Sequence, residues 1–133
     1  MPKNISALKQ AFEARLLDGA LPGELEGFGE EERKAAAAFV AEAAAERPPG
    51  TAKVVLESYE DERRRMRLTV INDDMPFLVD SISGALAAHD IAIHRILHPV
   101  LKVTRNEAGQ LIDIGPDAAG ARPESMVFIE TER

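Results

Sequence analysis

The sequence predicts an α+β fold: a helical N-terminal arm at residues 1–50, then a sheet-and-helix layer at residues 51–133. Two observations predict it. Apolar residues recur at helical spacing in the first part of the chain, and they alternate as in strands in the second part. Pro48-Pro49-Gly50 separates the two patterns, because consecutive prolines and a glycine interrupt regular structure.

Two helices are expected in the arm. The first covers residues 4–18 and ends at Asp18-Gly19. Its apolar residues share one face: Ile5, Leu8, Phe12 and Leu16. The second covers about residues 30–47 and is rich in alanine, which favours helix but buries little surface. Phe39 and Val40 are therefore its only large apolar anchors.

The second part opens with two short strands. They are predicted at residues 53–57 and 66–71, with a charged hairpin tip at residues 60–65 between them. A helix follows and ends near His89. The residues expected on its apolar face are Leu78, Ile82, Ala85, Leu86 and His89, with Val79 beside them.

A long strand is predicted from Ile91 to Val103, and it must be bent, bulged or at a sheet edge at Pro99, which cannot donate a ladder hydrogen bond. Period-two alternation defines its two faces. One carries Ile91, Ile93, Leu97, Leu101 and Val103; the other carries Ala92, His94, Ile96, His98 and Val100. A turn at residues 106–109, a loop at 113–124 and a strand at 125–130 complete a β-α-β-β order.

Composition excludes several classes of function. The net charge is −7 and no basic stripe is present, which argues against a nucleic acid partner. The absence of cysteine excludes disulfides and thiol nucleophiles. His94 and His98 would lie ~13 Å apart along a strand, so no metal site is expected. No membrane span or secretory signal is visible, and we expect a cytoplasmic protein without a membrane partner.

The most informative segment is Asn72-Asp73-Asp74-Met75-Pro76-Phe77-Leu78-Val79-Asp80-Ser81. It joins a strand to a helix through an acidic turn and a proline. Proline is tolerated in the first helical turn, and negative charge is favourable at a helix N-terminus. This strand, acidic turn, proline and helix resemble the opening of an ACT domain, a ferredoxin-like βαββαβ module that binds amino acids or pairs with its own copies.

Two blocks resemble, more closely, the first ACT-like domain of the large bacterial NAD-specific glutamate dehydrogenases. They are residues 70–81 and the run from His94 to Val103. The resemblance implies a non-catalytic N-terminal regulatory or assembly region of an enzyme that oxidatively deaminates glutamate to 2-oxoglutarate and ammonia with NAD. It implies no catalytic residue and no cofactor in this chain, with NAD bound elsewhere in the parent enzyme. It also implies contacts with the rest of the parent chain and with other subunits.

The glycines agree with a non-catalytic role. Gly27-Phe28-Gly29 is the only Gly-x-Gly in the chain, and Glu32 stands where a dinucleotide-binding turn needs its third glycine. Three glutamates directly after the second glycine would repel a phosphate. We therefore expect no nucleotide site here.

The predicted β-α-β-β order leaves the sheet incomplete, since a split βαβ sheet needs a second helix and a fourth strand. Either the strand at residues 53–57 fills part of the gap, or the chain is a piece of a longer protein. We expect the second, with the ACT-like domain truncated at its C-terminus.

Asn72, Asp73, Asp74 and Phe77 form a candidate effector site. The acid pair could hold an α-amino group, but both aspartates are more simply explained as turn and helix-start residues. Phe77 stands where ACT domains that bind amino acids commonly have glycine, which weakens the effector hypothesis. The alternative to a regulatory or assembly region is thus a stand-alone ACT-type amino-acid-binding sensor.

A second candidate set is an interface on the long strand. Its residues are His94, Ile96, His98 and Val100. ACT-like sheets commonly pair edge to edge or face to face, and this strand is long and apolar enough to do so.

Overall fold

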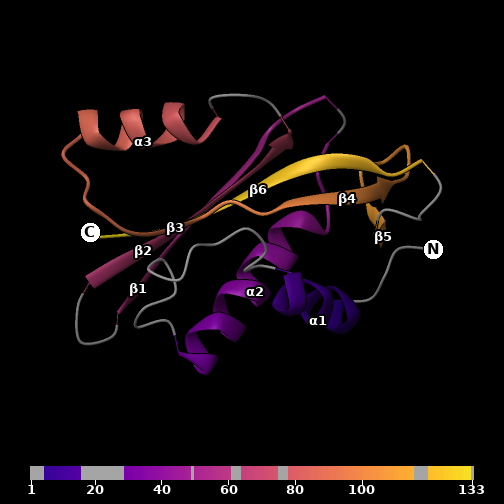
Figure 1. Ribbon diagram of the computed structural model, residues 1–133, viewed down its shortest axis with the longest axis horizontal. Helices are drawn as coiled ribbons and strands as arrows, with labels where there is room; N and C mark the ends of the chain where they lie inside the picture. Colours follow the sequence, from indigo (N-terminus) through magenta and orange to yellow (C-terminus); the bar gives the residue numbers. More distant parts are fainter. Residues whose placement is uncertain are drawn as a thin grey trace.

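Three helices and six strands make up the part of the chain that the computed structural model describes, namely residues 5–15, 29–48, 50–60, 64–74, 78–115 and 120–132. The helices are α1 (Ile5–Arg15), α2 (Glu30–Ala44) and α3 (Leu78–Ala88). The strands are β1 (Lys53–Glu60), β2 (Arg64–Asp73), β3 (Ile93–Leu97), β4 (Val100–Arg105), β5 (Leu111–Ile114) and β6 (Arg122–Glu132). Figure 1 shows α3 on one face of the sheet and α1 and α2 on the other. The α+β prediction is confirmed.

The sheet has the order β1-β2-β6-β4-β5, and β3 also pairs with β6. All of these pairings are antiparallel. β6 is the central strand, with β2 along one side and β3 and β4 in succession along the other. Helices cover both faces of this strand, and every residue from Glu124 to Thr131 is buried, with the apolar run Met126–Ile129 at its centre.

β1 occupies the place beside β2 that the fourth strand has in a ferredoxin-like sheet. It pairs with β2 in an unbroken antiparallel register from Lys53 opposite Ile71 to Glu60 opposite Arg64. The structure agrees with the first of the two alternatives for the incomplete sheet. The strand at the fourth position is β1, which precedes the β-α-β-β unit in the sequence. The helix that precedes β1, α2, lies on the face opposite α3.

The larger hydrophobic core lies between the sheet and the α1–α2 layer. Phe39 on α2 meets Phe128 on β6 edge to face, with ring centroids 6.2 Å apart. The alanines of α2 are buried too (Ala36, Ala37, Ala41, Ala43 and Ala44), because their small side chains let the helix approach its neighbours closely. α1, α2 and the sheet thus share one core, and Pro48 and Gly50 lie in the turn between α2 and β1.

The smaller core lies between the sheet and α3. Val79, Ile82 and Leu86 of α3 pack against a cluster of strand residues, Val70, Val127 and Ile129. Ala85 and His89, which we predicted on this face, are exposed instead. Ala85 lies at the rim of the stripe that residues 79, 82 and 86 define, and His89 lies in the turn after α3 ends at Ala88.

The prediction of one long strand from Ile91 to Val103 is wrong, although Pro99 interrupts it as expected. The chain forms β3, leaves the ladder at His98-Pro99 and resumes as β4; the Met126 N–H donates to the Pro99 carbonyl at 2.9 Å. A β-bulge between Ile93 and Arg95 adds one residue to β3. The added residue shifts the alternation, so Ile93 and Ile96 both pack on the α3 side instead of on opposite faces.

Several boundaries also differ from the prediction. β1, β2 and β6 are longer than predicted, and β5 was not predicted at all. The turn at residues 106–109 is confirmed: the Asn106 side chain accepts hydrogen bonds from the backbone of Ala108 and Gln110. Parts of the predicted hairpin tip, the Gly27-Phe28 pair, Pro76 and Phe77 lie outside the described residues. None of the described helices is long and apolar enough to span a membrane.

Candidate functional site

A cavity of about 430 Å³ opens where α2 ends beside the sheet. Its charged lining comes from four elements or their ends: Arg47, Asp73, Arg105, Arg122 and Glu124. Three guanidinium groups and two carboxylates thus line one hollow. A second cavity, between the end of α2 and the start of β1, has only Glu46 and Lys53 as charged lining residues.

Glu124 and two arginines form a buried ion cluster at the floor of this cavity. Arg105 donates from Nε and Nη2 to the Glu124 carboxylate, each at 2.9 Å. Arg47 Nη1 lies 3.0 Å from Glu124 Oε2. Arg47 and Glu124 are each only 5% exposed, so the two arginines compensate a carboxylate that burial alone would strongly disfavour.

Arg105 also closes the end of α2. Arg105 Nη1 donates to the carbonyls of Ala44 and Gly109, both at 2.8 Å. The last carbonyls of a helix have no partner within the helix, and a cation there also suits the helix dipole. The cluster therefore joins α2, the β4–β5 hairpin and β6 into one unit.

Gly109 allows this close approach. Its carbonyl accepts from the Arg47 N–H at 2.9 Å, and its φ is +84°. A Cβ built at this position would lie 1.9 Å from the Arg47 carbonyl oxygen. Only glycine fits both the backbone conformation and the space.

Two of the candidate effector residues, Asn72 and Asp73, contact the ion cluster, and a third, Asp74, faces the solvent. Asn72 Oδ1 accepts from Arg47 Nη2 at 3.2 Å, and Asp73 Oδ1 accepts from Arg47 Nη1 at 3.1 Å. Asp74 is exposed, and its N–H faces the Pro123 carbonyl at 3.4 Å. Phe77 lies outside the described residues. Asn72 and Asp73 are thus brought together with an arginine from the end of α2.

Sequence reasoning missed Arg47, Arg105 and Glu124. Arg47 is 25 residues or more from its partners on β2, and no local pattern links positions so far apart. One signal was available: Arg47 stands at the end of a predicted helix, where cations are favoured. Glu124 falls within the predicted loop at residues 113–124, and Arg105 lies two residues beyond the predicted end of the long strand.

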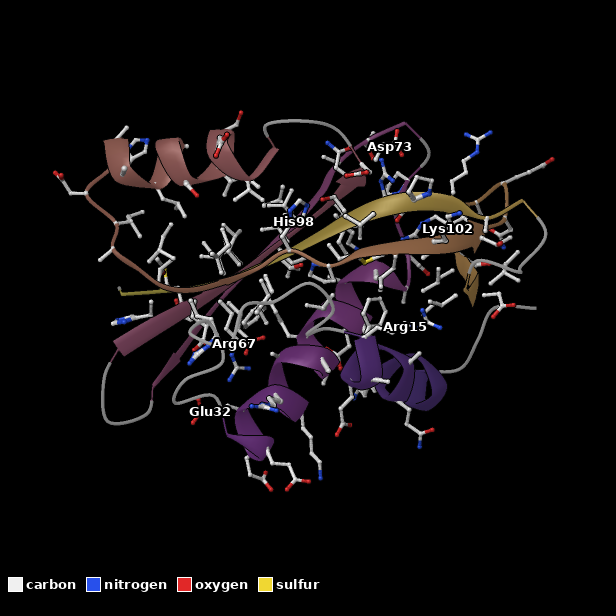
Figure 2. All side chains as sticks on the ribbon, viewed as in Figure 1. Arg15, Glu32, Arg67, Asp73, His98 and Lys102 are labelled. Atoms are coloured by element: carbon white, nitrogen blue, oxygen red, sulfur yellow. The ribbon has the colours of Figure 1, made fainter. Side chains whose placement is uncertain are left out.

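The candidate interface residues differ in exposure, and three of the four, His94, His98 and Val100, are exposed. Ile96 is half-buried in the cluster under α3, whereas His94 and Val100 are exposed. His98 contacts the Ser125 hydroxyl through Nε2. Figure 2 shows His98 on the α3 side of the sheet and Arg67 on the α2 side. Whether His94, Ile96, His98 and Val100 contact another protein stays a prediction.

The described residues offer no metal site, since no three of their histidines and carboxylates are placed to hold an ion. Two of the three cavity arginines, Arg47 and Arg105, are engaged by carboxylates and backbone carbonyls. Two groups face the open part of it: Asp73, whose side chain is 72% exposed, and Arg122. A carboxylate and a guanidinium group thus line the same hollow.

The fold and the site together define an ACT-like α+β domain with a buried ion cluster. The model of the family described as "Glutamate dehydrogenase, ACT1 domain" matches residues 12–133, and the chain belongs to that family. It is 37% identical over 70 residues to the NAD-specific glutamate dehydrogenase of Halomonas elongata, a match that covers 50% of this chain. It is 34% identical over 67 residues, or 48% of the chain, to the enzyme of the same name from Pseudomonas aeruginosa.

The chain spans only about 4% of the length of these two relatives. No solved structure matches it significantly. The similarity therefore concerns the ACT1 part of the relatives, and the expected resemblance to this family is confirmed.

Proposed function

We propose that this chain is a non-catalytic regulatory or assembly region of a large NAD-dependent glutamate dehydrogenase. The parent enzyme would oxidise glutamate to 2-oxoglutarate and ammonia with NAD in the cytoplasm. The observation that carries the proposal is the family match from residue 12 to residue 133, which includes the sheet, α2, α3 and the last turn of α1. The catalytic chemistry then belongs to the rest of a far longer polypeptide.

The organisation of the cavity supports a structural role for its charged groups. Glu124 receives two arginines, and those arginines also hold backbone carbonyls and the Asn72-Asp73 turn. Groups engaged in this way stabilise the join between α2 and the sheet. They are poorly placed to exchange protons with a substrate, because each has a fixed partner.

The direct test is an assay of the purified chain for glutamate-dependent reduction of NAD, followed by NADH absorbance. The full-length Pseudomonas aeruginosa enzyme serves as the positive control. We expect no NADH from this chain at any concentration at which it remains folded. Formation of NADH in proportion to the amount of chain would contradict the non-catalytic assignment.

A second candidate is a stand-alone amino-acid-binding sensor. The cavity favours it, because the Asp73 carboxylate and the Arg122 guanidinium line the same hollow and carry the charges that an amino acid needs. A ligand that binds only the native state raises its stability, by about 2–3 kcal/mol at a hundredfold excess over Kd. A panel of amino acids and NAD in a thermal melt tests it: a shift with one amino acid that Asp73→Asn and Arg122→Gln both remove supports the sensor.

A further inference from the structure

β1 is an unusually regular edge strand. All eight of its residues pair with β2 without a register shift, and within the described structure no strand lies along its other side. In an antiparallel pair half of the N–H and C=O groups point away from the partner strand. An uninterrupted edge of this length presents those groups to another strand.

The edge that β3 forms on the other side of the sheet is built differently. β3 has five residues, carries a bulge between Ile93 and Arg95 and ends just before Pro99. Short strands, bulges and prolines are the features that prevent edge-to-edge pairing. Of these two edges, β1 is therefore the one suited to receive a strand.

β1 also exposes apolar surface on the α3 side of the sheet. Val54 is 62% exposed and Leu56 is 60% exposed. In the register they stand opposite Val70 and Leu68, which belong to the core under α3. α3 covers that core but leaves the β1 residues beside it open to solvent.

The sequence of β1 is complementary to itself. If two copies align antiparallel with Val55 opposite Val55, Lys53 stands opposite Glu57 at both ends, and Val54 stands opposite Leu56. Neither charged residue is committed to a strong ion pair inside one copy. Lys53 donates to the Glu46 carbonyl, and Glu57 lies 3.8 Å from Arg67 with its side chain 51% exposed.

We propose that β1 pairs with β1 of a second copy across a twofold axis, which joins two sheets into one. This pairing rests on the assembly role proposed above. It gives that role a definite partner, a second copy of the chain, and a definite surface, the free edge of β1. The pairing forms two Lys53–Glu57 contacts on the α2 side and a strip of four apolar residues on the α3 side. A symmetric contact of this kind requires a surface that complements itself, as this register provides.

Sedimentation equilibrium of the whole chain at several concentrations tests the proposal. The wild type should show a monomer–dimer equilibrium. Lys53→Glu should weaken dimerisation roughly tenfold or more, because both charge pairs become repulsive. The double variant Lys53→Glu, Glu57→Lys should restore the wild-type Kd to within about threefold, since the pairs are re-formed with exchanged signs.

Two further variants keep the test decisive. Leu56→Lys places a charge in the centre of the apolar strip and should abolish the dimer. Lys102→Glu makes the same charge change as Lys53→Glu on an exposed position of β4 and should leave the Kd unchanged. Far-UV circular dichroism of every variant verifies that the fold is intact.

Two outcomes would overturn the pairing: a monomeric wild type at all concentrations, or a dimer that Lys53→Glu and Leu56→Lys both leave intact. An intact dimer would place assembly on another surface. Neither outcome touches the non-catalytic assignment, which only NADH formation in the assay contradicts.

Discussion

Arg105 and Glu124 form a two-point ion pair across neighbouring strands, with Nε 2.9 Å from Oε2 and Nη2 2.9 Å from Oε1. Such paired hydrogen bonds fix orientation as well as distance. Arg47 approaches the same carboxylate from the end of α2. The helical layer and the sheet are thus tied together at one buried carboxylate.

Replacing that carboxylate should destabilise the domain strongly. Glu124→Gln keeps the shape of the side chain but leaves the buried Arg105 guanidinium without its counter-ion and Arg47 with only the exposed Asp73 carboxylate, which costs about 3–5 kcal/mol. Urea denaturation followed by circular dichroism measures the change. Glu42→Gln is the matched control: it removes a half-exposed ion pair with Lys9 and should cost less than about 1 kcal/mol. Equal losses in the two variants would contradict a structural role for the cluster.

Gly109→Ala and Gly84→Ala should have effects of opposite sign. At Gly109 a methyl group meets the Arg47 carbonyl oxygen and the backbone φ is +84°, so we expect a loss of at least about 2 kcal/mol. At Gly84, inside α3, a methyl group meets no atom within 4 Å, and the higher helix propensity of alanine adds up to about 1 kcal/mol. Thermal melts of both variants give the comparison; a tolerated Gly109→Ala would show that Arg47 and the turn do not lie as described.

Phe39→Ala tests whether the helical layer and the sheet share one core. The ring is buried against Phe128, and its removal should cost about 3–5 kcal/mol. Helix and strand signals should also be lost in the same transition. Glu32→Ala, at an exposed position of the same helix, should change stability by no more than about 0.5 kcal/mol. A sheet that keeps its stability when Phe39→Ala melts the helices would contradict the shared core.

The order of helices and strands could be predicted because each element has its own local pattern. The helical stripe around Ile82 and Leu86, the Asn106 turn and the interruption at Pro99 all depend on neighbours within a few residues. The faces of β3 could not be predicted in this way. One bulged residue reverses every side chain after it, and a bulge has no strong sequence signal.

The ion cluster was beyond sequence reasoning for another reason. Asn72 and Asp73 were recognised as a special turn, but their partner Arg47 comes from a different layer of the fold. Pairing β1 with β2 and docking α2 on the β4–β5 hairpin bring these residues together. Such contacts depend on the complete topology rather than on spacing.

Hydrogen exchange of β1 amides at two protein concentrations is the most direct test of the proposed assembly. The β1 amides that do not donate to β2 should exchange quickly in dilute solution and become protected at high concentration, because only dimerisation gives them acceptors. The amides of β3 should exchange at the same rate in both samples. Protection of β1 that does not change with concentration, or a change confined to β3, would contradict the pairing of two copies through β1.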